Sequence, residues 1–233
     1  MGRRYGLRSS LARKDIALHS CRGRTALVTS ANQPLGREAV IALAYAGAQV
    51  VLHHHRSTHI RHVVEEACAS AGRARSVAAD LRSPAAAEML ATRTREIVGE
   101  RLDNLVINGE AARAPLMEEA TIEEFDLIVA AHVRAPFFLT RHLLPILHKG
   151  ASIIVIAPVA GKEDASRAAG RLMVGLADYL ASQLSGRGIR FNTILPADGG
   201  WHGPGAMQFA ETVAFLASED ANGISGNVHH VGH

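Results

Sequence analysis

The residues near the start of the sequence that are best placed to do chemistry form a turn from Ser30 to Gly36. The turn follows a short apolar run, residues 25–29, and precedes a segment whose apolar residues recur at helical spacing. In a strand, turn and helix of this kind, backbone amides of the turn and of the first helical turn can hold the pyrophosphate of a dinucleotide. Pro34 removes one amide hydrogen and restricts one dihedral angle. The turn is therefore a weakened phosphate site.

Thirteen histidines raise the question of a metal site. The densest group comprises His53, His54, His55, His59 and His62. Alternation along a strand points His54 away from its two neighbours, and the last two histidines lie on the face of a helix. These side chains do not converge as metal ligands, so we expect no metal site.

Strands and helices alternate along the chain after residue 24. Strands are predicted at residues 25–29, 49–53, 74–80, 104–108, 152–158, 189–195 and 226–231. Thr121 and Glu124 form a capping box before a long helix, residues 122–147, which Pro136 interrupts. A second long helix is predicted for residues 166–184. The alternation predicts an α/β fold: a single doubly wound Rossmann-type domain over residues 24–233, with a seven-stranded, mostly parallel sheet and helices on both faces.

Composition limits what the chain can be. With 233 residues and 48% hydrophobic content, it has enough apolar surface for one full core. No apolar run reaches about 18 residues, so no membrane span is expected, and the net charge of +3 does not suggest a nucleic-acid-binding face. Two cysteines without metal-type spacing suit a reducing cytoplasm. Residues 1–23 form a basic tail that we expect to be flexible, with a mitochondrial transit segment as the alternative.

Several phrases between residue 24 and the C-terminus resemble those of the short-chain dehydrogenase/reductase family. The phrases are ALVT, LDNLVIN, EEFDLIVAAHVRAPFFLT, SIIVIAPVAG, GIRFNTILPA and FLASEDANGISGNVHHV. Within the family, LHHHRS and TSANQPLGR look most like pteridine reductases and 3-oxoacyl-acyl-carrier-protein reductases. The resemblance implies a Rossmann fold, an NADP(H) site and reductase chemistry, each of which depends on particular residues.

The resemblance implies a cofactor site that this chain retains in part. The family's turn reads T-G-x-x-x-G-x-G or T-G-x-x-x-R-x-G, and of its glycines this chain keeps only Gly36. The positions that match the family's cofactor contacts are Ser30, Gly36, Arg56, Ser57, Asp80, Leu81 and Asn108. Arg56 and Ser57 stand where NADP-preferring relatives hold the 2′-phosphate; alternatively they are a solvated loop residue and a helix cap. Asp80 and Leu81 match the pair that flanks the adenine. We expect either no cofactor or weakly bound NADP(H).

The family's catalytic Asn, Ser, Tyr and Lys have all changed in this chain. The matching positions are His132, Pro158, Ser166 and Gly170. In the family, Tyr moves the proton at the substrate carbonyl, Lys lowers the pKa of that Tyr, Ser orients the carbonyl and Asn holds a relay water. Glu110 stands where the family's backbone meets the nicotinamide ribose. His132, Glu110 and Ser166 are candidates for a repurposed acid/base site facing the cleft. Alternatively, His132 is a packed helix residue bonded to a neighbouring carbonyl.

Three functions are compatible with these residues. The first is a family fold that has lost hydride transfer and serves as a non-catalytic partner or regulator, or as a cofactor-independent catalyst with a repurposed cleft. The second is an NADP(H)-dependent oxidoreductase that reduces a small carbonyl or pterin-like substrate. The third is nucleotide binding without chemistry.

The resemblance also implies an oligomer. Relatives pair through the two long helices, so we expect a homodimer or homotetramer, with an intact relative as another partner and a small molecule in the cleft. The apolar residues predicted for the interface are Ile128, Val129, Phe137, Phe138, Leu172, Met173 and Leu176. No nucleic-acid or membrane partner is expected.

Overall fold

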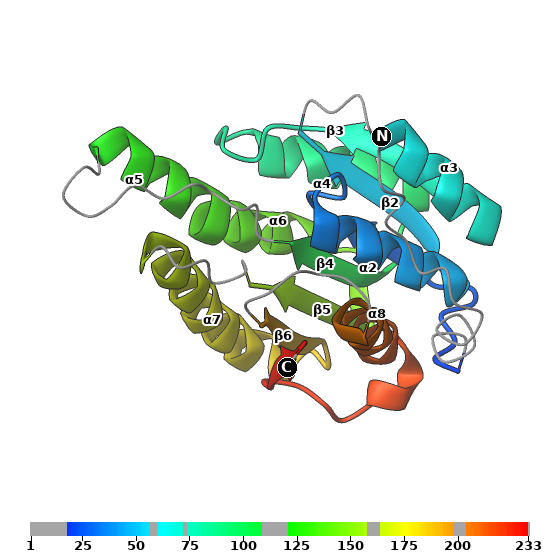
Figure 1. Cartoon of the computed structure of the whole chain (residues 1–233). Coiled ribbons are helices and arrows are strands. Elements are labelled where there is room, and N and C mark those ends of the chain that lie inside the picture. The colour runs from blue at the N-terminus through cyan, green and yellow to red at the C-terminus, as the bar shows by residue number, and fades with distance from the viewer. Residues whose placement is uncertain are drawn as a thin grey trace.

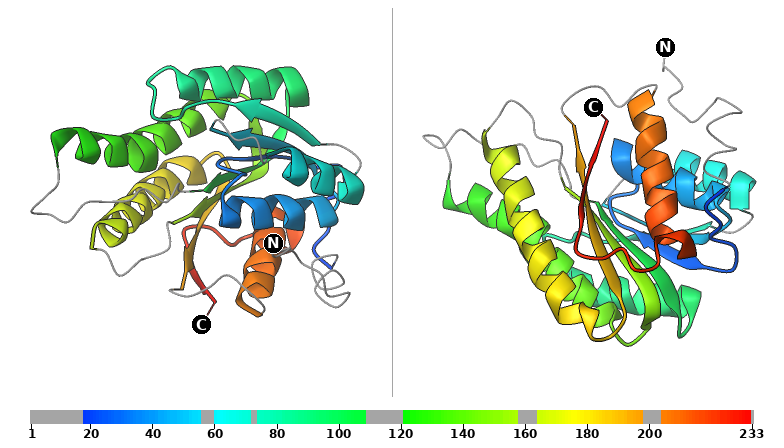
Figure 2. Two further views of the ribbon diagram at one scale, coloured as in Figure 1. Left: turned by 45° about the horizontal axis from the view of Figure 1, so that its top comes forward. Right: turned by 90° about the horizontal axis from the view of Figure 1, so that it is seen from below.

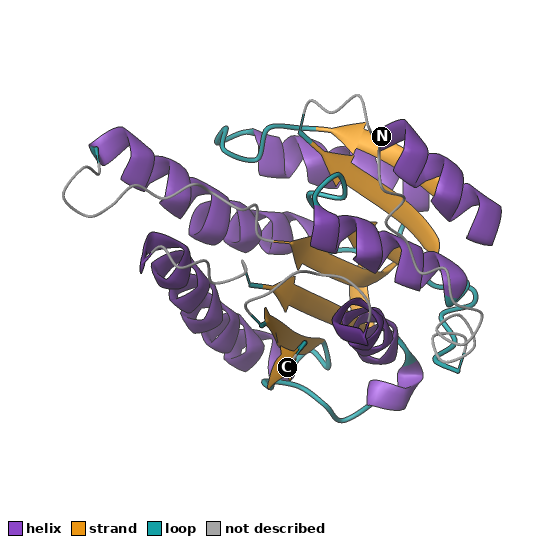
Figure 3. Ribbon diagram, viewed as in Figure 1, coloured by secondary structure: helices purple, strands orange, loops and turns teal. Residues whose placement is uncertain are grey.

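Seven parallel strands form a sheet at the centre of the structure (Figures 1 and 3). The structure is a computed structural model, and it describes residues 18–55, 60–71, 74–108, 121–157, 164–197 and 204–232. The strands are β1 (Thr25–Val28), β2 (Gln49–His54), β3 (Ala74–Ala78), β4 (Leu102–Asn108), β5 (Leu147–Ile156), β6 (Arg190–Pro196) and β7 (Val228–Val231). Their spatial order is β3-β2-β1-β4-β5-β6-β7, and every neighbouring pair is parallel. The predicted doubly wound α/β fold is confirmed.

Helices cover both faces of the sheet (Figure 2). They are α2 (Pro34–Tyr45), α3 (Ile60–Ala71), α4 (Ala86–Val98), α5 (Ile122–Val129), α6 (Ala135–Leu143), α7 (Asp164–Ser185) and α8 (Pro204–Ala217). Side chains of α2, α3 and α8 pack into one apolar layer, and those of α4, α6 and α7 pack into a second. Alternate residues of β4 supply the two layers, since Val106 lies in the first and Leu105 in the second. Over the described ranges, no helix is long and apolar enough to cross a membrane.

Strand β5 is longer than its apolar run predicts. The sequence predicts a strand from residue 152, whereas β5 begins at Leu147. The added residues include His148, Lys149 and Gly150, which do not alternate between apolar and polar. The pairing of β5 with β4 also shifts register within residues 102–104 of β4. Hydrophobic periodicity misses this segment because only Leu147 of its first four residues is a buried apolar side chain.

The long helix before β5 is interrupted by a wider turn rather than by a break. The predicted capping box is present at the start of α5: the Thr121 hydroxyl accepts from the Glu124 amide, and the Glu124 carboxylate accepts from the Thr121 amide. Residues Ala130–Arg134 form one π-helical turn, after which α6 continues. Pro136 has no amide hydrogen for the carbonyl of His132, and in an α-helix its ring would crowd that carbonyl. A π turn just before Pro136 relieves the crowding and keeps the chain helical.

The residues immediately before β1 pack against the domain. The Cys21 side chain is fully buried, and the Cys21 amide donates to the Ala46 carbonyl at 2.8 Å. Arg24 forms an ion pair with Glu219 at 3.0 Å. Cys21 and Arg24 thus contact the domain, whereas Leu18 is exposed. Residues 1–17 lie outside the described range.

A buried carboxylate joins three strands at their amino ends. Asp103 of β4 accepts from the amide and hydroxyl of Thr25 in β1 at 2.8 and 3.2 Å, and from the Arg101 guanidinium at 2.9 and 2.8 Å. Nε2 of His148 in β5 lies 2.8 Å from the same carboxylate. Burial acts to raise the pKa of Asp103, but the hydrogen bonds from Arg101, Thr25 and His148 outweigh it and lower that pKa. The ionised carboxylate therefore stabilises the pairing of β1, β4 and β5.

Replacing Asp103 with alanine is expected to destabilise the fold by about 2–3 kcal/mol, because the Thr25 amide loses its buried acceptor. Urea unfolding at neutral pH, followed by circular dichroism, measures the change. Asp126→Ala, at an exposed position of α5, is the matched control and is expected to change stability by less than about 0.5 kcal/mol. An Asp103→Ala protein as stable as this control would contradict the role of the carboxylate.

Candidate functional site

Ser30 begins the turn after β1 in a left-handed backbone conformation. Its φ is 47°, and no other non-glycine residue of the described ranges has a positive φ. Glycine adopts such a conformation without a side-chain penalty, so the turn keeps the backbone shape of a glycine-containing turn with serine in that place. The Gln33 amide donates to the Ser30 carbonyl at 3.0 Å and helps to hold this strained residue.

His53, near the end of β2, holds the other side of the turn. Its side chain is 2% exposed, Nδ1 accepts from the Ser30 amide at 3.1 Å, and Nε2 donates to the Ala79 carbonyl at 3.0 Å. These bonds require a neutral imidazole with its proton on Nε2. Burial lowers the pKa of His53 to about 4, which keeps the ring neutral at neutral pH. The signal in the sequence is strand alternation, because His53 shares a face with the buried Val51.

Gly36 is required by the packing of the first turn of α2. A Cβ atom there would lie 2.2 Å from the Ser30 carbonyl oxygen and 2.9 Å from Nδ2 of Asn108. Nδ2 of Asn108 donates to the same Ser30 oxygen at 3.3 Å, and the Asn108 amide donates to the Thr29 hydroxyl at 2.9 Å. The structure thus brings the predicted site residues Ser30, Gly36 and Asn108 together. The three residues contact one another directly.

The gap left beside these residues is small. Ser30, Leu81 and Asn108 line it from the ends of the strands, and Pro136 of α6 closes it. Its volume is about 20 Å³, which is room for about one water molecule. Pro34 is the first residue of α2, so the helix presents no amide hydrogen at that position. This position therefore lacks one of the amide hydrogens with which a glycine-rich turn can hold a pyrophosphate.

Asp80, which follows β3, is engaged with its own neighbours. Its carboxylate accepts two hydrogen bonds from the Arg82 guanidinium at 2.9 and 3.0 Å and lies 3.3 Å from Nε2 of His55. The side-chain hydrogen bond from Arg82 is the main reason that the pKa of Asp80 falls to about 2. Arg134 of the π turn in turn donates to the Arg82 carbonyl. The carboxylate predicted to flank an adenine is therefore paired within the protein.

His132 lies in the π turn and packs between α6 and α7. Its side chain is 0% exposed, and neither ring nitrogen has a hydrogen-bond partner within the described part of the chain. The apolar side chains around it are Pro136, Val155, Met173, Leu176, Ala177, Leu180 and Phe191. The space beside the ring has no room for a water molecule. Burial lowers the pKa of His132 to about 4, so the imidazole is neutral. The alternative prediction is that His132 is a packed helix residue bonded to a neighbouring carbonyl. The side chain is packed, but no carbonyl of the described residues accepts a hydrogen bond from it.

The other predicted site residues are only partly described. Arg56, Ser57 and Glu110 lie outside the described residues. Ser166 belongs to the first turns of α7, where the backbone is described and the side chain is not. The first α7 residue beside His132 is Met173, seven positions further along (173 minus 166), which corresponds to about 10 Å of helix.

The histidines do not form a metal site in the described part of the chain. Within it, no group of three or more His, Cys, Asp or Glu side chains is placed to hold an ion. His53 is bonded to backbone groups, whereas His55 lies beside Asp80. His59 lies outside the described residues.

The parallel sheet, the strand order and the turn after β1 define a protein of the dinucleotide-binding α/β class. The profile of the short chain dehydrogenase family matches residues 24–199, and the chain belongs to this family. The family resemblance inferred from the sequence is thereby confirmed. The finer resemblance, to pteridine reductases and acyl-carrier-protein reductases, stays a prediction.

Similar proteins include several oxidoreductases. Oxidoreductase UcpA of Escherichia coli K12 is 30% identical over 75% of this chain and 68% of its own length. Among solved structures, a dehydrogenase/reductase of Sinorhizobium meliloti 1021 has a TM-score of 0.82 at 28% identity, covering 94% of this chain and 97% of its own. The landomycin C-6 ketoreductase LanV, solved with bound NADP and rabelomycin, has a TM-score of 0.80 at 30% identity, covering 90% of this chain and 94% of its own.

The two buried histidines are expected to make stability depend on pH. Burial lowers the pKa of His53 and His132 from 6.5 to about 4, so between these values the unfolded chain binds more protons than the folded protein. Their contribution is fully present above pH 6.5 and is lost as the pH falls toward 4. In the His132→Leu variant, the pH-dependent contribution of His132 to stability is absent. The stability of this variant relative to the native protein should rise by about 1.4 kcal/mol per pH unit of acidification through the window.

Urea unfolding of both proteins across that window measures the effect. Met89→Leu, at a side chain that is 45% exposed, is the control; neither side chain titrates, so its difference from the native protein should stay constant. A constant difference for His132→Leu as well would mean that His132 is not held neutral by burial.

Proposed function

We propose that this member of the short-chain dehydrogenase/reductase family has lost hydride transfer and acts in the cytoplasm as a non-catalytic partner or regulator. One observation carries the proposal. Ser30, Gly36 and Asn108, three of the predicted cofactor contacts, contact one another, and the gap beside them is about 20 Å³. Cavities that hold a small ligand are far larger, about 300–1,000 Å³. The buried free thiol of Cys21 is in keeping with a reducing compartment.

The position of the family's catalytic Asn supports the same proposal. His132 occupies that position, and the space beside its ring has no room for a relay water. Ser166 and Gly170 stand at the positions of the family's Tyr and Lys. Neither residue carries a group that titrates near neutral pH, so neither can move a proton at a substrate carbonyl as a Tyr with a lowered pKa does.

A cofactor-independent catalyst is the second form of this proposal. It would use His132, Glu110 and Ser166 around a small molecule in the cleft, with the neutral imidazole as general base. A general base must come within hydrogen-bonding reach of the proton that it removes. His132 would have to leave its apolar surroundings to do so, and the packing around it therefore favours the non-catalytic role.

An NADP(H)-dependent reductase of a small carbonyl or pterin-like substrate is the second candidate function. The observation in its favour is that similar structures were solved with NADP, among them a short chain dehydrogenase of Burkholderia cenocepacia J2315 with a TM-score of 0.81 at 25% identity, covering 90% of this chain and 96% of its own. The backbone of the turn also keeps its left-handed residue, Ser30. In this function NADP(H) would be bound weakly.

Titration of the full-length protein with NADPH separates these functions. We expect no saturable change in NADPH fluorescence, and no NADPH oxidation with small ketones or pterins, because the turn and Asp80 are already engaged. An Arg82→Ala variant, which releases one partner of Asp80, tests whether that pairing limits binding. Binding without oxidation would support nucleotide binding without chemistry. Oxidation at ordinary enzymatic rates would overturn the proposal.

We further propose that the protein forms a homodimer or homotetramer through α5 and α7, or pairs there with an intact relative. Helix α5 extends from the sheet and buries none of its residues (Figure 1). Phe125 of α5 is 58% exposed, and Leu172 and Tyr179 of α7 are 43% and 52% exposed. Solvated apolar side chains on adjacent helices are typical of an interface. Met173, which the sequence predicts for the same face, is 1% exposed and belongs to the core.

Replacing Phe125 and Leu172 together with glutamate is expected to shift the protein to monomers, because the charges could not be buried in the interface. Sedimentation velocity measures the oligomeric state. Met89→Glu, on α4 at a side chain that is 45% exposed, is the control and should leave the oligomer intact. A double variant that sediments like the native oligomer would place the interface elsewhere.

A further inference from the structure

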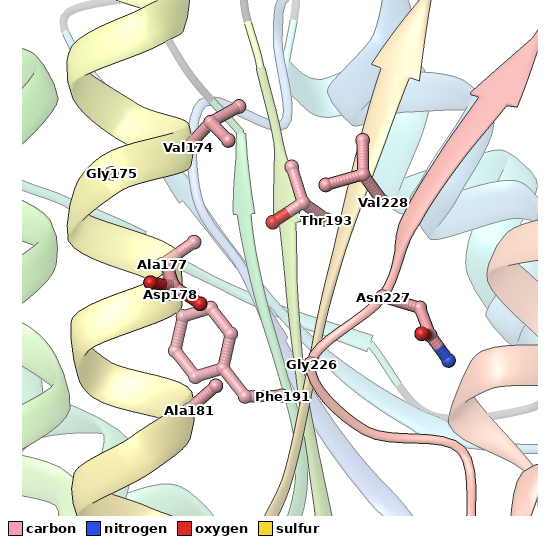
Figure 4. A pocket seen from close by; sticks show the side chains of 10 residues that line it. All are labelled: Val174, Gly175, Ala177, Asp178, Ala181, Phe191, Thr193, Gly226, Asn227 and Val228. Atoms are coloured by element: carbon pink, nitrogen blue, oxygen red, sulfur yellow. The ribbon is translucent and has the colours of Figure 1, made fainter.

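A separate cavity lies between α7 and the strands β6 and β7 (Figure 4). Its volume is about 310 Å³, at the lower end of the range for cavities that hold small molecules. Small residues of α7, among them Gly175, Ala177 and Ala181, leave the space open. The cavity shares no lining residue with the gap beside Ser30, so it is distinct from the turn after β1.

Among the described residues, the wall of this cavity carries one charge, and the charge is negative. Asp178 of α7 is exposed and has no ion-pair partner within the described part of the chain. No Lys, Arg or His in that part of the chain lines the cavity. The Phe191 ring and Thr193 of β6 line the same space, while the side chain of Asn227 turns away from it (Figure 4). The remaining wall is apolar or glycine.

We propose that this cavity binds a small organic cation, that is, a primary or methylated ammonium group on a compact apolar body. A carboxylate attracts the ammonium group through a charge-assisted hydrogen bond. The apolar body would displace water from the small residues of α7 and from the exposed Val228. An anion would be repelled by the Asp178 carboxylate. A neutral molecule would leave the charge of that carboxylate unpaired. The chemistry of the wall therefore selects a cation.

The cavity and the proposed oligomer surface occupy neighbouring faces of α7. Successive residues of a helix are turned by about 100°, so Asp178 at the cavity and the exposed Tyr179 point about 100° apart. Gly175, which lines the cavity, lies one helical turn before Tyr179.

The inner wall of the cavity provides a reporter of binding. Phe191 and Ala177 also line the space beside His132, so the imidazole lies behind the wall that the apolar body would contact. Ring protons of His132 should therefore shift when the cavity is filled. Their resonances are identified by their loss from the spectrum of His132→Leu.

Titration of the full-length protein with benzylamine, which is cationic at neutral pH, tests the proposal by NMR. We expect saturable binding with shifts at His132. Asp178→Asn should weaken binding by up to about fivefold, the size expected for an exposed ion pair. Asp126→Asn removes the same charge from exposed α5 and should leave the affinity unchanged. Benzyl alcohol, the neutral counterpart, should bind more weakly and should not respond to Asp178→Asn.

Val228→Trp is a second test variant, and its expected effect is steric rather than electrostatic. Val228 is 42% exposed at the rim of the cavity, so a larger side chain there should block entry without disturbing the core. Loss of benzylamine binding in this variant would support the location. Failure of benzylamine to bind the native protein would overturn the proposal, as would equal weakening by the two aspartate substitutions. Equal affinity for benzylamine and benzyl alcohol would overturn the selection of a cation.

Discussion

The carbonyl oxygen of Ser30 is the contact on which the arrangement of β1, β4 and α2 depends. The Gln33 amide and Nδ2 of Asn108 donate to it at 3.0 and 3.3 Å, and the missing side chain of Gly36 lets α2 approach it. On the other side of the same residue, the Ser30 amide donates to His53. Both backbone polar groups are thereby satisfied within the protein. The turn keeps its shape without a bound ligand.

Hydrogen bonds within the protein explain how the family fold can persist under the proposed loss of hydride transfer. Asn108 and Asp80 match family positions that contact a nucleotide, yet here they bond to Ser30 and to Arg82. A polar group that already has a good partner gains little from a new one, because it must give up the first. A cofactor that bound to these two side chains would have to replace the bonds that they make within the protein.

Local signals in the sequence predict most of the fold but less of the site. Strand alternation and the capping box at Thr121 depend on residues a few positions apart, and both are present in the structure. The bonds of His53 to Ser30 and Ala79 join residues 23 and 26 positions apart, which no local pattern reveals. The pairing of Asp80 with Arg82 spans only two positions and was open to prediction. Arg56, Ser57 and Glu110 lie outside the described residues and remain predictions.

A fold that gives up its cofactor must also replace the stability that the cofactor supplied. A ligand present at a hundred times its Kd stabilises the folded state by about 2.7 kcal/mol. The hydrogen bonds around Ser30, at about 0.5–1.5 kcal/mol each, can together supply a similar amount. His132 acts in the opposite direction, because its unpaired ring nitrogens lose their hydration on burial, at about 1–3 kcal/mol for each polar group. Replacing His132 with an apolar side chain would therefore remove this cost and leave the bonds around Ser30 in place.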